Sequence, residues 1–222
     1  MNTTPLAALR CVLFDLDGTF ADTAPDLAHA LNHILQQQGR APLPLLQVRP
    51  FVSHGAAALV AAGFPEVRDG DWLELRRREL VDAYRQQICR DTTTFPGIAE
   101  LVEALELRAV RWGIVTNKPA ALTQPLLTAL GYWQRACCVV SGDTLPLAKP
   151  DPAPVLHACQ LAGVAPAATL CVGDAERDIV SGRAAGCRTV VARFGYLDST
   201  ECPEAWGASG MIDHPQELLA WL

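Results

Sequence analysis

The sequence predicts an α/β protein with a mainly parallel sheet flanked by helices. Apolar, β-rich runs alternate with helix-like stretches through most of the chain, which is the pattern of a parallel sheet covered on both faces. Several helix-like stretches are followed directly by a glycine, at positions 131, 163 and 186, where a helix usually ends. One long segment after the first strand holds helix-like patterns and no convincing strand, and this predicts a second structural unit.

The alternation gives five expected strands and four expected helices. The strand-like runs are residues 10–14, 112–116, 137–140, 169–172 and 189–193. The helix-like stretches between them are residues 98–107, 120–130, 153–162 and 176–185. When each strand is joined to the next parallel strand by a helix, the carboxyl ends of all the strands lie at the same edge of the sheet.

The segment 22–91 breaks the alternation. It holds helix-like patterns at 26–38, 55–62 and 71–89, with a proline-containing loop between the first two and no convincing strand. An all-helical block inserted there is expected to sit over the carboxyl edge of the sheet. We therefore predict a helical cap over 22–91 and an α/β core formed by 1–21 and 92–222.

Composition excludes several classes of function. Of the 222 residues, 50% are hydrophobic and the net charge is −6, so there is no electrostatic footprint for nucleic acid or an anionic membrane. No apolar run reaches the length of a membrane span, and residues 1–10 lack the pattern of a secretory signal. We expect a cytoplasmic protein whose partner is a small molecule. The eight cysteines show no zinc spacing and are expected to be inert thiols.

The first strand ends in two carboxylates, Asp15 and Asp17, followed by Gly18. A buried strand has no structural need for two negative charges at its carboxyl end, and burying an unpaired carboxylate costs several kcal/mol or more. Gly18 would let the chain turn so that both carboxylates face one pocket. The alternative is an ordinary Asp-Gly turn.

Three further groups of polar residues follow later strands. Thr116 and Asn117 follow the second strand, Lys149 follows the third, and Asp174 follows the fourth, with Asp178 one helical turn beyond it. Each group taken alone also fits a turn, a surface loop or a helix cap. Their occurrence at successive strand ends of one sheet indicates a shared site.

Together these residues indicate phosphoryl transfer. Four aspartates (15, 17, 174 and 178) would crowd one site, and two like charges about 4 Å apart repel by roughly 4 kcal/mol at an effective dielectric near 20. An all-oxygen cluster of this kind calls for a cation, with Mg²⁺ favoured. Lys149 adds fixed positive charge. Asp15 is then the candidate nucleophile, and Asp17 the candidate acid that protonates the leaving oxygen and later activates water.

The chain resembles the haloacid dehalogenase superfamily of phosphatases, which has a Rossmann-like core. The run Asp15-Leu16-Asp17-Gly18-Thr19 resembles its first motif, Thr116-Asn117 its second, Lys149-Pro150 its third, and Gly173-Asp174 with Asp178 its fourth. The resemblance implies that the side chains of Asp15 and Asp174 and the backbone carbonyl of Asp17 bind Mg²⁺, supported by Asp178. It also implies that Thr116, Asn117 and Lys149 hold the phosphoryl group.

Particular residues narrow the resemblance to phosphatases. A haloacid dehalogenase has no aspartate at the position of Asp17. The segment 22–91 contains no lysine, because Lys118 and Lys149 are the only two in the chain, and this weighs against relatives that use a cap lysine. The loop Val52-Ser53-His54-Gly55 is similar to that of phosphoglycolate phosphatases, and the tail is similar to that of the N-acetylmuramic acid 6-phosphate phosphatases of that group.

The expected activity is Mg²⁺-dependent hydrolysis of a small phosphomonoester by a monomer or homodimer. His54 is a candidate contact for the leaving group, with packing in the cap loop as the alternative, and Arg49 is a candidate for a substrate carboxylate. His29 and His33 are expected on a solvated helix surface. The rival functions are a sugar-phosphate phosphotransferase or mutase and a catalytically silent binding module.

Overall fold

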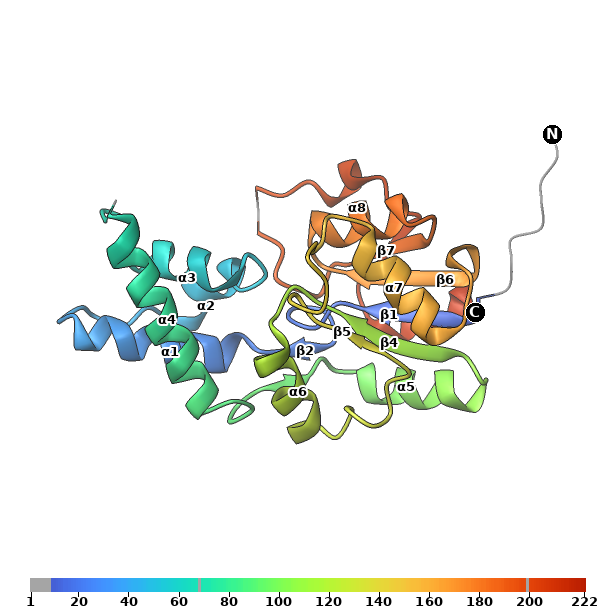
Figure 1. The fold of residues 1–222 in the computed structure, drawn as a ribbon, viewed down its shortest axis with the longest axis horizontal. Helices are drawn as coiled ribbons and strands as arrows, with labels where there is room; N and C mark the ends of the chain where they lie inside the picture. Colours follow the sequence, from blue (N-terminus) through green and yellow to red (C-terminus); the bar gives the residue numbers. More distant parts are fainter. Residues whose placement is uncertain (1–8, 68, 199) are drawn as a thin grey trace.

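The computed structural model describes residues 9–67, 69–198 and 200–222 and confirms the predicted α/β fold. Its main sheet has six strands in the order β5-β4-β1-β6-β7-β8, all parallel (Figure 1). The strand β1 therefore lies in the middle of the sheet, between β4 and β6. The start of the predicted core segment and most of the segment considered for a secretory signal lie outside the described residues.

The five predicted strands are present in the main sheet, and one further strand of this sheet, β8, was not predicted. The strands are β1 (Cys11–Phe14), β4 (Arg111–Val115), β5 (Val139–Val140), β6 (Thr169–Gly173), β7 (Arg188–Ala192) and β8 (Gly210–Ile212). Successive residues of β1 face opposite sides, as a strand requires. Val12 and Phe14 belong to one hydrophobic cluster, while Cys11 and Leu13 belong to another. The sheet is thus buried on both faces.

Four helices cover the sheet on its two faces (Figure 1). They are α5 (Ile98–Leu107), α6 (Ala120–Ala129), α7 (Ala153–Ala162) and α8 (Glu176–Ala184), close to their predicted bounds. Buried residues of α5 and α6 join the cluster of Phe14, and those of α7 join the cluster of Leu13. Short 3₁₀ turns occur at Pro166–Ala168, Pro203–Trp206 and Pro215–Trp221.

The helices of the inserted segment lie together beside the sheet, at the left of Figure 1. They are α1 (Ala24–Gln37), α2 (Leu45–Val48), a 3₁₀ turn (Arg49–Phe51), α3 (Gly55–Gly63) and α4 (Gly70–Gln86). Two short antiparallel strands, β2 (Ala21–Asp22) and β3 (Thr93–Thr94), pair where the chain leaves and re-enters the core. On this basis we propose that the cap spans 22–91 and the core the remainder.

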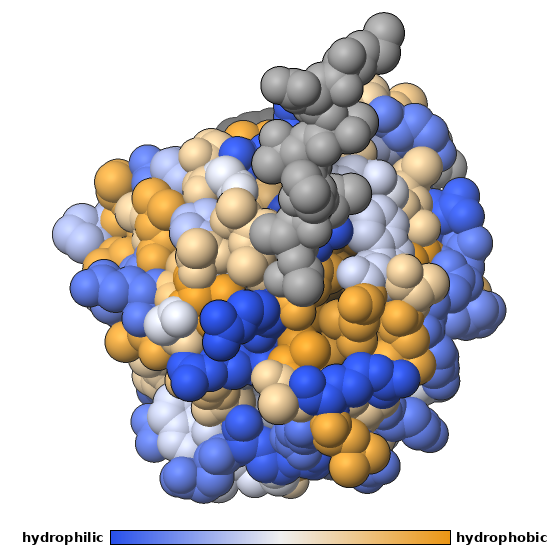
Figure 2. All heavy atoms as spheres, turned by 90° about the vertical axis from the view of Figure 1, so that its right-hand side faces the viewer, coloured by the Kyte–Doolittle hydropathy of each residue, from blue (hydrophilic) through white to orange (hydrophobic). Residues whose placement is uncertain are grey.

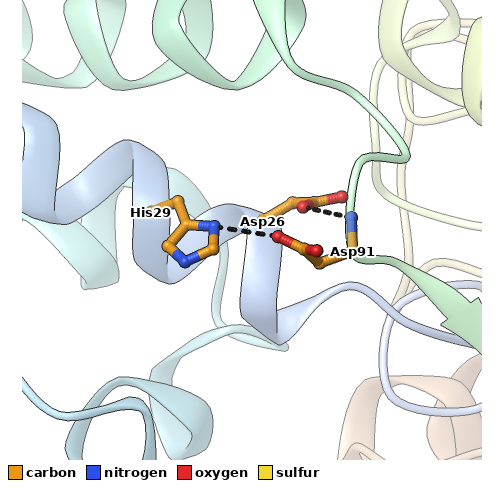
Figure 3. A group of neighbouring side chains, drawn as sticks. All are labelled: Asp26, His29 and Asp91. Atoms are coloured by element: carbon orange, nitrogen blue, oxygen red, sulfur yellow. Dashed lines mark hydrogen bonds and ion pairs between the residues drawn. The ribbon is translucent and has the colours of Figure 1, made fainter.

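A buried carboxylate joins the two connections between these units. Asp26, at the start of α1, accepts hydrogen bonds from the backbone N–H groups of Asp91 and Thr92 at 2.8 and 3.1 Å and from the Thr92 hydroxyl at 2.7 Å. Figure 3 shows the His29 ring next to the side-chain carboxylate of Asp91, with 3.3 Å between His29 Nδ1 and Asp91 Oδ2. Asp26 therefore hydrogen-bonds the segment that leaves the core, at the start of α1, to the segment that re-enters the core at Asp91 and Thr92.

The end of the core remote from these helices has a mixed surface. Figure 2 shows hydrophobic side chains interspersed with hydrophilic ones on that face. Among the described residues, no helix combines the length and apolar character needed to cross a lipid bilayer. The residues singled out from the sequence lie at the opposite end, where the carboxyl ends of the strands face the inserted helices.

Candidate active site

Three charged side chains meet at the carboxyl end of the central strand. Asp15 follows β1 directly, Lys149 lies in the loop after β5, and Asp178 lies in the first turn of α8. The Lys149 Nζ is 2.9 Å from an Asp15 oxygen, 2.6 Å from an Asp178 oxygen and 2.6 Å from the Val115 carbonyl. Burial lowers the pKa of Lys149, but the charges of Asp15 and Asp178 outweigh it and raise the pKa above its ordinary value. Lys149 is thus a fixed buried cation.

Asp174 is the most completely enclosed carboxylate of the group, at 1% exposure. Its two oxygens accept hydrogen bonds from the hydroxyls of Thr19 and Ser53, at 3.0 and 2.7 Å, and from the backbone N–H of Tyr196 at 3.0 Å. Burial raises the pKa of Asp174 to about 7, and the nearby charge of Asp15 adds to the effect. The folded protein therefore holds a carboxylate that is strongly destabilised as an anion unless a cation is beside it.

Gly18 allows the chain to fold back over these carboxylates. Its φ is +88°, and an added Cβ would lie 2.1 Å from an oxygen of Asp174 and 2.8 Å from the ring of Tyr196. Only glycine meets both requirements without moving the neighbouring groups. The predicted turn after Asp17 is therefore needed by the geometry of the site.

Asp17 is held on the side of the site that faces the cap. One of its oxygens is 2.9 Å from the Lys118 Nζ and accepts a hydrogen bond of 2.5 Å from the Thr23 hydroxyl. The Lys118 ammonium also lies 4.5 Å from the centre of the Tyr84 ring, which belongs to α4. Burial lowers the pKa of Lys118, but the charge of Asp17 more than offsets this and raises it. Both lysines of the chain are thus charged and buried at this site.

The two residues predicted to bind phosphate beside Lys149 lie at the end of β4. Thr116 is buried and its hydroxyl accepts a hydrogen bond from the Lys118 N–H at 3.2 Å. The Asn117 amide exchanges two hydrogen bonds with the Lys149 backbone, at 2.8 and 3.0 Å. The side chain of Asn117 therefore positions the Lys149 loop. Its backbone N–H has no acceptor within the described part of the chain and is the group left to bind an anion.

These residues form the floor of a cavity of about 380 Å³. The floor comprises Asp15, Asp17, Thr116, Asn117, Lys118 and Lys149. The wall opposite belongs to the inserted helices and is largely apolar, and it comprises Leu27, Val52, Leu59, Arg77, Leu80, Val81 and Tyr84. Concave sites with an apolar wall and a few convergent polar groups are typical of small-molecule binding.

The loop before α3 closes one side of the cavity. The Ser53 hydroxyl reaches Asp174, and the Ser53 carbonyl accepts a hydrogen bond from the guanidinium of Arg177 on α8. His54 lines the cavity, and its ring also comes within 4.8 Å of carboxylate oxygens of Asp198 and Glu201. Together with a longer hydrogen bond of 3.5 Å from the Ser53 hydroxyl to the Asp17 carbonyl, these contacts connect this loop of the inserted segment to the core.

Arg49 and the histidines of α1 lie elsewhere. Arg49 pairs with Asp22 at 2.9 Å, its guanidinium lies 4.9 Å from the centre of the Tyr196 ring, and it is not among the residues that line the cavity. His29 and His33 line a separate groove between α1 and α4.

The carboxylates after β1 and β6 fit a divalent cation. One oxygen from each of Asp15, Asp174 and Asp178 lies within 4.8 Å of the others. The donors are all oxygen, and hard cations such as Mg²⁺ prefer such ligands. The raised pKa of Asp174 indicates that the three charges are unfavourable together without a counter-ion.

Three residues at the site were not identified as functional from the sequence. Lys118 follows Thr116 and Asn117 directly, so its position after a strand was the available signal. Ser53 was noted only as part of the loop that contains His54. Tyr84 had no signal, because its helix pattern is equally consistent with ordinary packing against another helix.

Comparisons with known proteins show which family the chain resembles over most of its length. The profile of the family Haloacid dehalogenase-like hydrolase matches residues 12–192. An N-acetylmuramic acid 6-phosphate phosphatase of Pseudomonas aeruginosa is 41% identical over 211 residues, covering 95% of this chain and 93% of the relative. A phosphoglycolate phosphatase of Xylella fastidiosa is 40% identical, covering 94% and 91%. The crystal structure of a predicted phosphoglycolate phosphatase from Haemophilus somnus has a TM-score of 0.84 at 28% identity, covering 96% and 97%.

Proposed function

The chain belongs to the haloacid dehalogenase-like hydrolases, and from this premise we propose that it is a Mg²⁺-dependent phosphatase that hydrolyses a small phosphomonoester through an aspartyl-phosphate on Asp15. The observation that carries the proposal is the position of Asp15. Its carboxylate lies on the cavity floor, 2.9 Å from the Lys149 ammonium and beside Asp174 and Asp178. The relatives at 41% and 40% identity are named as phosphatases of N-acetylmuramic acid 6-phosphate and of phosphoglycolate.

Asp15 is suited to attack a phosphorus atom because its surroundings hold it in one orientation on the cavity floor. Lys149 binds one of its oxygens, and the same ammonium would face the oxygens of a bound phosphoryl group. The Thr116 hydroxyl and the Asn117 N–H line the same floor and complete the anion site. Catalysis of phosphoryl transfer depends mainly on such positioning and on stabilisation of charge.

Asp17 is the residue that moves the proton. In the first step it would donate a proton to the leaving oxygen, and in the second it would accept one from the water that attacks the phosphorus of the intermediate. In this structure Lys118 and Thr23 occupy one Asp17 oxygen. The other Asp17 oxygen is therefore the one that we propose exchanges the proton with the leaving group and with water.

Asp15, Asp174 and Asp178, with the Asp17 carbonyl, are the groups we propose to hold Mg²⁺. When bound, Mg²⁺ supplies positive charge that stabilises the negative charge developing on the phosphoryl oxygens. Asp178 also accepts a hydrogen bond from the backbone N–H of Ala175 at 3.0 Å, and this fixes the start of α8 next to Asp174. His54, at the cavity edge, is proposed to contact the leaving group.

Turnover of p-nitrophenyl phosphate by Asp15→Asn tests the proposal. We expect the rate to fall by about 10⁴-fold or more, because the nucleophile is lost while its volume is kept. The matched control is Asp213→Asn, which makes the same change at an exposed aspartate paired with Arg193. Turnover by Asp15→Asn at the rate of the control would contradict the mechanism, and so would turnover unaffected by a chelator.

The second candidate is a phosphotransferase, in which an alcohol replaces water as the acceptor. The observation that favours transfer is the size of the cavity, because a volume of about 380 Å³ can hold an acceptor as well as a phosphoryl group. Product analysis with glycerol or a sugar present separates the two. We expect inorganic phosphate as the product, and a phosphorylated acceptor as the main product would assign the chain to transfer.

A further inference from the structure

The side chain of Tyr196 lies between the core and the first helix of the cap. Tyr196 belongs to the loop after β7 and is buried. Its ring packs beside Gly18, where an added Cβ would lie 2.8 Å away, and its centre is 6.0 Å from that of Phe95. The Arg49 guanidinium of the cap lies 4.9 Å from the ring centre. One buried side chain thus contacts the turn after Asp17, the connection that re-enters the core, and the cap.

The Tyr196 hydroxyl supplies a hydrogen bond that usually comes from the residue before a helix. The first N–H groups of a helix have no acceptor within it, and the side chain of the N-cap residue commonly accepts one. Thr23 is the N-cap residue of α1, but its hydroxyl accepts no such bond in the described structure. Ala24, the first residue of the helix, instead donates its N–H to the Tyr196 hydroxyl at 3.0 Å. The start of α1 is therefore held by a residue 172 positions away in the sequence.

Asp22 fixes the direction of the Tyr196 hydroxyl. The hydroxyl donates its proton to one Asp22 oxygen at 2.7 Å, which leaves its lone pairs for the Ala24 N–H. The other Asp22 oxygen pairs with Arg49 at 2.9 Å, so the carboxylate is held from both sides. Burial and the charge of Asp22 raise the pKa of Tyr196 well above its ordinary value, so the hydroxyl keeps its proton.

The Thr23 hydroxyl, which does not cap α1, binds the proposed acid instead. It donates to Asp17 at 2.5 Å, on the same oxygen that the Lys118 ammonium contacts. Thr23 is fully buried, so this bond is shielded from water. The orientation of Asp17 therefore depends on where α1 begins, and the Tyr196 hydroxyl fixes that position.

The backbone of Tyr196 binds the opposite side of the site. Its N–H donates to Asp174 at 3.0 Å. The preceding residue, Gly195, allows this close approach, because an added Cβ would lie 2.4 Å from both the Asp174 Cβ and the Gly18 carbonyl oxygen. Tyr196 thus binds a proposed metal ligand through its main chain and the start of α1 through its side chain. A change confined to the hydroxyl separates these two contacts.

We propose that Tyr196 is a positioning residue whose hydroxyl fixes the start of α1, so that Thr23 holds Asp17 in the orientation for proton transfer. The inference rests on the proposed phosphatase activity and concerns its first step. In that step an Asp15 oxygen forms a bond to phosphorus, the bond from phosphorus to the leaving oxygen breaks, and the Asp17 proton moves to that oxygen. Tyr196 touches neither the substrate nor the reacting atoms.

The leaving group decides how much this step depends on Asp17. The oxygen of an alkyl ester leaves poorly as an anion and has to be protonated as its bond to phosphorus breaks. p-Nitrophenolate leaves readily as an anion, so its departure depends little on an acid. A residue that positions Asp17 should therefore affect alkyl esters more than p-nitrophenyl phosphate, whereas a residue with only a structural role should affect both equally.

Tyr196→Phe removes the hydroxyl and keeps the ring and the N–H to Asp174. The measurement is kcat/KM, which reports the first phosphoryl transfer, for p-nitrophenyl phosphate and for the alkyl esters named for the relatives, phosphoglycolate and N-acetylmuramic acid 6-phosphate. We expect a loss of about tenfold for the alkyl ester that the wild type hydrolyses faster, and of less than about twofold for p-nitrophenyl phosphate. The control is Tyr132→Phe, at another buried tyrosine of the core. Equal losses for the two esters, or no loss for either, would overturn the proposal.

A double variant tests whether Tyr196 acts through Thr23. Thr23→Val removes the hydroxyl that binds Asp17 and keeps the shape of the side chain. Residues that act through one contact are not additive, so Tyr196→Phe should lower kcat/KM for the alkyl ester by less than about twofold further in this background. A full tenfold further loss would show that Tyr196 acts by another route and would contradict the inference.

Amide hydrogen exchange of the metal-free protein separates this inference from the proposed activity. Tyr196→Phe should speed exchange of the Ala24 N–H by about tenfold, because the amide loses its acceptor, and Tyr132→Phe should leave it unchanged. Unchanged exchange in Tyr196→Phe overturns the inference whatever the activity. Faster exchange in a chain that hydrolyses no phosphoester supports the hold on α1 and contradicts the proposed function.

Discussion

The floor of the cavity and its cap wall hold their side chains in different ways. On the floor, Lys149 is 3% exposed in its side chain and contacts three oxygens, and Asp174 accepts three hydrogen bonds. On the wall, Leu80 and Tyr84 present buried, mainly apolar side chains, and the side chain of Arg77 is 41% exposed. The charged side chains of the floor are held by buried contacts within the protein, whereas the wall is mostly apolar and its charged side chain, Arg77, is partly exposed.

This difference assigns the chemical step to the floor and the choice among substrates to the wall. Attack on phosphorus requires groups held in place before the substrate arrives, and buried ion pairs supply that rigidity. Recognition of a leaving group requires donors and charges whose partner is the substrate. Variants of the floor should therefore affect every substrate, while variants of the wall should change the preference among substrates.

Lys149→Met gives the largest effect we expect from the floor apart from loss of Asp15. It leaves Asp15 and Asp178 without their shared cation, so turnover of every phosphoester should fall by about 10³-fold. Unfolding in urea, measured without Mg²⁺, should show a loss of about 3 kcal/mol, as for other broken buried pairs. Arg193→Met, at an exposed ion pair, is the control. If Lys149→Met changed the preference among substrates without lowering turnover of all of them, the assignment of the floor to the chemical step would be wrong.

Asp26→Ala tests the connection between the two regions. The change leaves two backbone N–H groups and the Thr92 hydroxyl without their acceptor, at a cost of about 2 kcal/mol in the free energy of unfolding. His29→Ala removes only the half-exposed contact with Asp91 and should cost less than about 0.5 kcal/mol (Figure 3). Denaturant unfolding measures both. Equal effects would show that Asp26 does not fasten the two connections.

The smallest expected effect is the pH dependence of the stability of the protein with and without Mg²⁺. The pKa of Asp174 is about 7 in the folded chain against 3.8 for an ordinary aspartate, so the folded state binds more protons between these values. The metal-free protein therefore loses stability from this group as pH rises through that window. A cation requires the ionised carboxylate, so added Mg²⁺ should raise the Tm more at about pH 8 than at about pH 5.5. Equal increments at the two pH values would remove Asp174 from the metal site.

Regular periodicity explains which parts of the fold were predictable. Residues 98–107 and 153–162 form helices with the predicted bounds, because their apolar spacing and flanking residues agree with the tertiary packing. The strand β8 (Gly210–Ile212) was missed because three residues are too few to show alternation. These residues are held in an extended conformation by pairing with β7, which is a tertiary contact. The pair β2 and β3 was missed for the same reason.

The predictability of the candidate site follows the same division. Asp15 and Asp174 were found because polar residues directly after buried strands are unusual, and Lys149 was found in the loop that follows the third predicted strand. A parallel sheet brings such positions together. Tyr84 was not found because a helical tyrosine carries no local sign of which neighbour its face meets. Only the fold shows that α4 faces the strand ends.

The most direct test of the central claim is to trap the intermediate on Asp15. The full chain is mixed with Mg²⁺ and a phosphoester, quenched with acid and treated with borohydride, which reduces an aspartyl-phosphate to homoserine. Peptide mass spectrometry then locates the reduced residue. We predict homoserine at position 15, dependent on both substrate and Mg²⁺. Steady turnover with Asp15 unmodified, or with the reduction at another carboxylate, would contradict the account.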